Sequence, residues 1–424
     1  MITKQSSETI TLPINSRQDF RSTLDGIASE GARQMLMLAL EVEVENYISA
    51  HTSHVDENGH RLVVRNGKGQ PRSVTTGVGA HEIKAPRVDD RRDGQKFISK
   101  LLPPYLRKSP KVESLLPLLY LKGLSTGSFE GALREFLGEG SMGLSPSAIV
   151  KLKTKWEQEF NEWKDQPIGE DIVYIWADGV NLSIRLGEDS RICLLVILGA
   201  TVGGKKKLLA MHPGYRESEE SWACVLSSLQ ARGLKNPLLA IGDGALGFWN
   251  ALRASEAFLN TKEQRCWVHK IANVLDKFPK RSQGNAKQLL HDMMRAETEA
   301  DAEVSLASFE KLYSAKYPKA VECLTKDWKT LTAFFSFPAE HWLHLRTTNP
   351  IESAFATVKH RTRGMKGAGS KTTAVTMAFK LLKECEKRWH RLRGSEEIKK
   401  LREGLEYKNG IVIAKQILQQ GAAS

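Results

Sequence analysis

The sequence predicts an α/β fold built around a mixed sheet, and three features support this prediction. Between residues 171 and 270, apolar runs and amphipathic helices follow in the order three strands, helix, strand, helix, strand. Residues 271–342 then have helical spacing without a strand pattern. Most of the chain before residue 169 also has a helical pattern, with one glycine-rich interruption. We therefore expect a mixed-sheet core with an all-helical insertion, preceded by a mainly helical N-terminal region.

The N-terminal region begins with a predicted helix over residues 29–50. Its apolar residues recur at helical spacing and form one stripe: Leu36, Leu40, Val44, Tyr47 and Ile48. Residues 61–92 contain glycines and short alternating runs, which predict short strands and turns.

Three further helices are predicted at 112–122, 128–137 and 146–164. Ser145 is a suitable N-cap for the third, and Pro146 suits its first helical position. The second and third helices resemble a helix-turn-helix with a long joint, in which the third would contact DNA through Lys151, Lys153 and Lys155. Two packed helices without DNA contact are the alternative.

The sequence predicts bounds for each strand and helix of the sheet region. Strands are predicted at 172–177, 181–186, 191–201, 238–241 and 264–268, with helices at 218–232 and 245–254. An antiparallel meander followed by parallel crossovers is the arrangement of a ribonuclease-H-like sheet. A last helix is predicted over 349–363.

Composition narrows the class of protein. The 424 residues carry a net charge of +13, contain five scattered cysteines, and are 41% hydrophobic. These values indicate a globular chain without a disulfide framework. The N-terminus lacks a secretion-signal pattern and no apolar run is long enough to span a bilayer, so we expect a cytoplasmic protein.

The positive charge is concentrated in two segments. Residues 61–111 have 13 basic and 4 acidic residues, and residues 353–393 have 11 basic and 2 acidic ones, so each carries +9. The rest of the chain is therefore at −5. Two separate basic segments favour two contact surfaces for the phosphate backbone of DNA. Solvated helix faces are the alternative for each.

Two aspartates follow apolar strands of the predicted sheet. Asp178 comes after 172–177, and Asp243 comes after 238–241. Ligand sites in open α/β sheets lie at the carboxyl ends of strands, and carboxylates are preferred ligands of Mg²⁺. Each Asp precedes a glycine, however, and Asp-Gly alone commonly marks a turn.

A third acid, Glu352, begins the predicted helix at 349–363. Asn349 as N-cap and Pro350 as first helical residue would make Glu352 part of a capping box. The same Glu would complete a set of three carboxylates for two metal ions. Lys359 lies two turns further on the same face and suits a phosphate near that site.

At these residues the chain resembles a Mutator-family insertion-sequence transposase, one of the DDE transposases. The motifs are IWADGV around Asp178, IGDGALGFWNAL around Asp243, QRCWVHKIANVLDKFPK, and HLRTTNPIESAFATVKHRT around Glu352. The resemblance implies that these three acids form a metal-binding triad. Our hypothesis is that they hold two Mg²⁺ or Mn²⁺ ions, with Asp178 bridging both and Asp243 and Glu352 binding one each. The resemblance also implies a ribonuclease-H-like core and a Cys-x-x-His motif, matched here by Cys266 and His269.

The resemblance further implies an activity and partners. The protein would bind terminal inverted repeats, cleave DNA and transfer strands to target DNA, as a nucleoid-associated bacterial homo-oligomer, at least a dimer. The expected division is 1–111 for end binding, 112–168 helical, 169–270 plus 346–395 catalytic core, 271–345 insertion and 396–424 tail. Additional DNA contacts are expected from Arg346, Arg361 and Arg363.

Several residues near these motifs keep two interpretations. Cys266 and His269 would form a zinc site with His341 and His344, or be a buried Cys and a hydrogen-bonded His on the last strand. Trp267 and Trp342 would stack a DNA base or pack in the core. Arg346 would contact phosphate or fix a loop carbonyl.

Two other functions remain open. One is a transposase-derived nuclease that cleaves DNA without strand transfer, and the other is a DNA-binding protein without activity. A nucleotide-hydrolysing partner is disfavoured, because the chain has no G-x-x-x-x-G-K-[ST] motif.

Overall fold

The computed structural model describes residues 17–121, 135, 146–184, 191–214, 217–244, 246–364, 368 and 370–413. The helix expected over 128–137 and the glycine-rich joint after it lie outside these residues, apart from Glu135. The chain divides into two compact units, Met1–Val150 and Lys151–Ser424. No helix among the described residues is long and apolar enough to cross a membrane.

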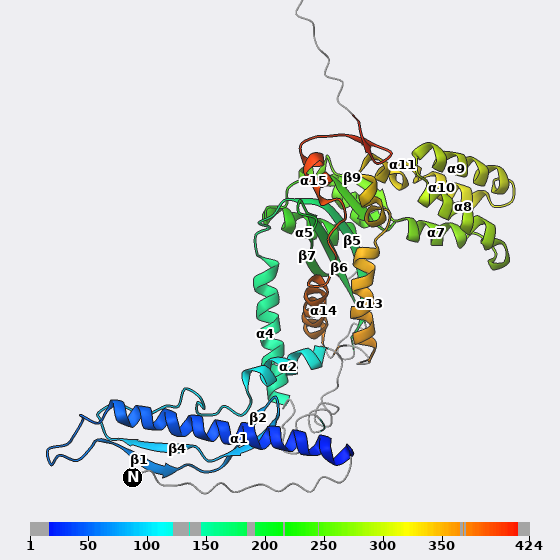
Figure 1. Ribbon diagram of the computed structural model, residues 1–424. Helices are drawn as coiled ribbons and strands as arrows, with labels where there is room; N and C mark the ends of the chain where they lie inside the picture. The colour runs from blue at the N-terminus through cyan, green and yellow to red at the C-terminus, as the bar shows by residue number, and fades with distance from the viewer. Residues whose placement is uncertain are drawn as a thin grey trace, which may run out of the picture. The chain divides into compact units, whose positions relative to one another are not determined.

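In the first unit, one long helix lies along short strands (Figure 1). The elements are α1 (Arg17–Ala50), β1 (Val63–Lys68), β2 (Arg72–Thr76), β3 (Gly79–Ile83), β4 (Pro86–Asp90) and α2 (Pro110–Leu121). The pairs β1–β4 and β2–β3 are antiparallel. The predicted strands and turns are therefore present, and α1 begins earlier than its apolar stripe indicates. Leu40 of α1 packs with Val74 and Ile83 in a small core, because these apolar side chains are shielded there from water.

The second unit contains a five-stranded mixed sheet in the order β7-β6-β5-β8-β9. The strands and the helices between them are β5 (Ile172–Ser183), β6 (Arg191–Thr201), β7 (Lys206–Gly214), α5 (Glu219–Ala231), β8 (Leu239–Gly242), α6 (Leu246–Ala254) and β9 (Lys262–Arg265). Strands β5, β6 and β7 form an antiparallel meander, and β8 and β9 run parallel to β5. α4 (Pro146–Lys164) precedes the sheet.

The three strands of the antiparallel meander are not the three that the sequence predicts. The predicted strands 172–177 and 181–186 are one strand, β5, so Asp178 and Gly179 do not form a turn. The reason is that β6 pairs with β5 along its whole length, whereas the parallel partner β8 ends beside Ala177. The third antiparallel strand is β7, which the prediction missed.

Helices cover both faces of this sheet. Trp222 of α5 and Phe248 of α6 pack on the face that carries Ile175 and Ala177. Tyr174 and Trp176 alternate with those residues and therefore point to the other face. There the Trp176 indole donates to the carbonyl of His344, just before α13 (Asn349–Gly364). Helices α13 and α14 (Lys371–Glu386) contact β5 and β7 respectively.

The chain between β9 and α13 is helical, as its spacing predicts. The α-helices are α7 (Trp267–Leu275), α8 (Gln283–Arg295), α9 (Glu299–Tyr313), α10 (Pro318–Thr325), α11 (Trp328–Leu331) and α12 (Trp342–Leu345). Figure 1 shows α7, α8, α9 and α10 gathered in one group beside the sheet. After α14 come α15 (Ser395–Arg402), β10 (Tyr407–Lys408) and β11 (Ile411–Val412).

Candidate active site

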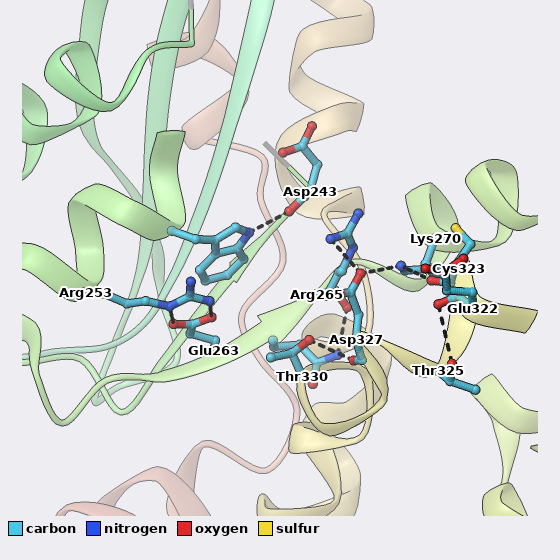
Figure 2. Close-up of polar contacts among 12 residues, drawn as sticks. Asp243, Arg253, Glu263, Arg265, Lys270, Glu322, Cys323, Thr325, Asp327 and Thr330 are labelled. Carbon is cyan, nitrogen blue, oxygen red and sulfur yellow. Dashed lines mark hydrogen bonds and ion pairs between the residues drawn. The ribbon is translucent and has the colours of Figure 1, made fainter. Parts of the chain in front are cut away.

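The two predicted aspartates lie at the edge of the sheet where the parallel pairing of β5 with β8 ends. In the parallel register of β5 and β8, Ala177 pairs with Gly242, so Asp178 is the next residue of β5 and Asp243 is the first residue after β8. Trp249 of α6 donates its indole hydrogen to the backbone carbonyl of Asp243 at 2.9 Å, which fixes the chain where β8 ends (Figure 2). The sheet therefore brings both carboxylates to one place.

The charge of Asp178 is unfavourable in this position without a counter-charge. Burial, and then the negative charge of Asp243, raise the pKa of Asp178 to about 7. The backbone amide of Gly179 donates to its Oδ1 at 2.8 Å and opposes this rise only in part. Two neighbouring carboxylates are also oxygen ligands of the kind that a hard divalent cation prefers.

Glu217 is a fourth carboxylate at this edge, and sequence reasoning missed it. It lies between β7 and α5, and a Cβ on Gly179 would stand 2.2 Å from its Oε1. Burial and the charge of Asp243 raise the pKa of Glu217. The sequence gives only a weak signal for Glu217. Glu219 and Glu220 follow it, and acids are common at the start of any helix.

Glu352 comes from α13, which packs its buried residues against the core: Ile351, Ala354, Phe355 and Val358. The helix begins at Asn349, one residue earlier than the capping box requires. Glu352 accordingly has a different partner, since the hydroxyl of Thr348 donates to its Oε1 at 2.5 Å. That contact fixes one carboxylate oxygen of a side chain that stays partly exposed.

Cys266 and His269 lie beside Glu352. β9 ends at Arg265, so both residues belong to the start of α7 and not to the last strand, which corrects the prediction. The backbone amide of Thr348 donates to Cys266 Sγ at 3.3 Å, and His269 Nδ1 is 3.7 Å from Glu352 Oε1. A hydrogen bond with Cys266, helped by the charge of Glu352, raises the pKa of His269 to about 9.

The four-residue zinc site is not assembled. One atom each of Cys266, His269 and Glu352 lies within 4.8 Å of the others. His341 instead uses both ring nitrogens elsewhere, with the Tyr174 hydroxyl at 2.9 Å and the Gly394 carbonyl at 3.0 Å. His341 is also fully buried, so it cannot turn toward the cysteine without breaking both contacts.

Both tryptophans beside the insertion are part of the core. Trp267 is 0% exposed and donates to the Leu331 carbonyl, and Trp342 is 7% exposed and donates to the Phe337 carbonyl. A ring must present a free face in order to stack a DNA base. Core packing is therefore the interpretation that the structure supports.

Arg346 also makes its contacts inside the protein. Its guanidinium lies 4.6 Å from the ring centre of Phe334 and 5.0 Å from that of Trp342, and donates to the Ala296 carbonyl at 3.4 Å. Burial lowers its pKa to about 10. These contacts match the loop-fixing alternative more closely than a phosphate contact.

Replacing Arg346 with methionine tests these alternatives. We expect the variant to lose about 1–2 kcal/mol of stability in urea unfolding, because a desolvated cation over two rings contributes about that much. Its affinity for DNA should stay within about twofold of the wild type, since the cation that it removes faces the core. A large loss of DNA affinity with unchanged stability would return Arg346 to the DNA-contacting group.

The remaining predicted contacts lie on two helices. Lys359 is exposed on α13, two turns after Glu352, and Arg361 is partly exposed on the same helix. Arg363 also belongs to α13. On α4, Lys151 and Lys155 are exposed and Lys153 is partly exposed.

The family profile and the most similar known proteins agree on one protein family. The sequence profile of the transposases of the Mutator family matches residues 3–391. The transposase for insertion sequence element IS6120 of Mycolicibacterium smegmatis is 46% identical over 300 residues, which is 70% of this chain and 92% of that protein. The transposase for element IST2 of Acidithiobacillus ferrooxidans is 46% identical over 281 residues, 66% of this chain and 94% of that protein. The transposase for element IS256 of Staphylococcus aureus is 27% identical, covering 82% and 87%. The chain therefore belongs to the Mutator family of insertion-sequence transposases.

Proposed function

We propose that this transposase binds the terminal inverted repeats of its element and cleaves and joins DNA strands, using divalent metal ions held by Asp178, Asp243 and Glu352. The adjacency of the two aspartates on β5 and β8 carries this proposal. Asp178 is paired with Val196 of β6, and Asp243 directly follows Gly242, the last paired residue of β8. Two ions of Mg²⁺ or Mn²⁺ would activate the attacking water or 3′-hydroxyl and stabilise the leaving oxygen.

The protein's own groups would divide the remaining tasks. The two aspartates supply charge from the sheet edge, Thr348 donates to Glu352, and His269 lies close enough to feel the charges of both Glu352 and Asp178. Lys359, exposed two turns along α13, is placed to hold a phosphate of the bound strand. No side chain is needed as a covalent nucleophile, because the attacking group belongs to water or to DNA.

We assign the parts of the chain as follows. Residues 169–270 and 346–395 form a ribonuclease-H-like catalytic core around the sheet, and 271–345 are its insertion. Residues 1–111 and the helices of 112–168 bind the element ends. A homo-oligomer, at least a dimer, would hold two ends together, because each end needs its own site.

Removal of metal tests the proposal directly. Wild-type protein and a supercoiled plasmid carrying the inverted repeats that flank its gene should give end cleavage with Mg²⁺ and none in excess EDTA. Adding Mg²⁺ back should restore the rate, measured as 3′-ends on a sequencing gel. End binding, measured by gel shift, should persist in EDTA. Cleavage that continues in the chelator at an unchanged rate would contradict the proposal.

Strand joining separates this function from a nuclease. A pre-cleaved end with a free 3′-hydroxyl should be joined to target DNA by the same protein and metal. Cleavage without joining would favour the transposase-derived nuclease, and binding without cleavage would favour the inactive DNA-binding protein.

A further inference from the structure

A positively charged cleft lies between α7 and α10, outside the set of carboxylates. Its volume is about 420 Å³, which falls in the range of ligand sites. The cations that line it are Arg265, Lys270, Lys277, Lys319 and Lys326, and we call this the α7–α10 cleft. Two acids, Asp276 and Glu322, also line it, and Asp327 pairs with two of the cations, so cations exceed acids by two. Such an excess attracts an anion.

The inner end of the cleft contains two cations and one carboxylate. Lys270 is fully buried, donates to the carbonyl of Cys323 at 2.6 Å, and pairs with Asp327. Arg265 pairs with the same Asp327 oxygen at 2.8 Å, and its Nε is buried without a hydrogen-bond partner among the described residues. Here one positive charge is left over.

This inner end touches the edge of the sheet that carries the aspartates. Arg265 is paired with Gly242 in the register of β8 and β9. A Cβ on Gly244 would stand 1.9 Å from Arg265 Nη2, so the guanidinium lies against the residue that follows Asp243. Figure 2 shows Arg265 between Asp243 and the pair formed by Lys270 and Asp327. Glycine at position 244 is what permits this close approach.

The outer part of the cleft is a row of exposed lysines. Lys326, the C-cap residue of α10, lies two turns after Lys319 on the same helix face, and Lys277 lies two residues after the end of α7. Within the part of the chain that the structure describes, no ion pair is recorded for these three exposed lysines. A phosphate would therefore not have to displace a carboxylate from them.

We propose that the α7–α10 cleft binds backbone phosphates of the DNA strand that continues beyond the cleaved phosphodiester. This inference rests on the proposed function, because it takes the nearby aspartates as the place of cleavage. A guanidinium at the inner end suits a phosphate held in a fixed position, and lysines along the outer part suit a flexible, sequence-independent backbone. The insertion would then position the strand as well as fold beside the sheet.

Two matched pairs of substitutions test the cleft without disturbing buried groups. Lys319→Gln/Lys326→Gln neutralises two exposed lysines of the cleft, and Lys287→Gln/Lys311→Gln neutralises two exposed lysines of α8 and α9 outside it. The cleft pair should weaken binding of an end duplex that extends past the cleavage point about tenfold, and lower the salt slope by about 2. The control pair should change affinity less than about twofold.

Neutral phosphates locate the contact on the DNA. Methylphosphonates placed one at a time beyond the cleavage point should weaken wild-type binding at one or two positions. At those positions they should have no further effect on the cleft pair. Inorganic phosphate is added as a competitor at constant ionic strength, in order to test whether the cleft binds only free anions. Competition by inorganic phosphate without any position-specific methylphosphonate effect would overturn the assignment to DNA.

The outcomes also separate this inference from the proposed function. If the wild type cleaves DNA with Mg²⁺ but the cleft pair binds and cleaves like the control pair, the cleft is not a DNA site and the proposed function stands. If the wild type binds ends but does not cleave in any divalent metal, the proposed function fails. In that case a loss of binding confined to the cleft pair would still show a phosphate contact in the insertion.

Discussion

Replacing Asp178 with asparagine is expected to lower the rate of end cleavage about a thousandfold or more. Asn keeps the shape of the side chain but removes the charge that would hold a divalent ion. Loss of metal-based stabilisation of a transition state amounts to several kcal/mol, and about 4 kcal/mol corresponds to a thousandfold. The measurement is the initial rate of 3′-end formation with saturating Mg²⁺, with end binding measured in parallel.

The same substitution should leave the fold intact. Asp178 is buried beside Asp243, so its replacement removes a repulsion between like charges. Without metal, the variant should therefore unfold at the same or a higher urea concentration than the wild type. Asp292→Asn, at an exposed position of α8, is the matched control and should keep full activity. Cleavage by the Asp178→Asn protein at the wild-type rate would remove this residue from the site.

The sequence predicted the sheet well where each strand was a continuous apolar run. β6 and β8 are such runs, and both lie close to the predicted ranges. The prediction failed at β5, because Asp178-Gly179 looks like a turn when only neighbouring residues are considered. Pairing with β6 keeps that dipeptide extended, and such pairing is a tertiary effect that local patterns do not contain. β7 was missed because Lys206 and Lys207 precede its short apolar stretch.

The candidate site was predictable in part for a similar reason. Asp178 and Asp243 each follow an apolar run of residues, and that position is visible in a single sequence. Glu217 and Thr348 reach the site from connections whose path depends on how α5 and α13 pack. Arg346 looked like a phosphate ligand because arginines often are, yet its guanidinium lies over the rings of Phe334 and Trp342. Only the packed structure distinguishes these roles.

The ion cluster of Arg265, Lys270 and Asp327 joins the sheet to the insertion. Arg265 ends β9, Lys270 is in the second turn of α7, and Asp327 lies between α10 and α11. Asp327 is the shared acid of both cations, so removing it leaves two positive charges with little access to water. The close-up in Figure 2 shows all three side chains converging. Their arrangement makes Asp327 the most sensitive member of the cluster.

Asp327→Ala is therefore expected to destabilise the protein by about 3 kcal/mol, measured as the free energy of unfolding in urea. Breaking a buried ion pair by removing one partner usually costs about 3–5 kcal/mol, and the lower value applies because the Asp327 side chain is 20% exposed. Asp292→Ala, in exposed α8, should change stability by less than about 0.5 kcal/mol. The triple variant Arg265→Met/Lys270→Met/Asp327→Leu should recover most of the loss, because it removes the unpaired charges and keeps apolar volume. If the triple variant were as unstable as Asp327→Ala alone, packing and not unpaired charge would account for the cluster's contribution. Even with its stability recovered, the triple variant should bind DNA ends less tightly than the wild type, because Arg265 and Lys270 supply the inner charge of the α7–α10 cleft.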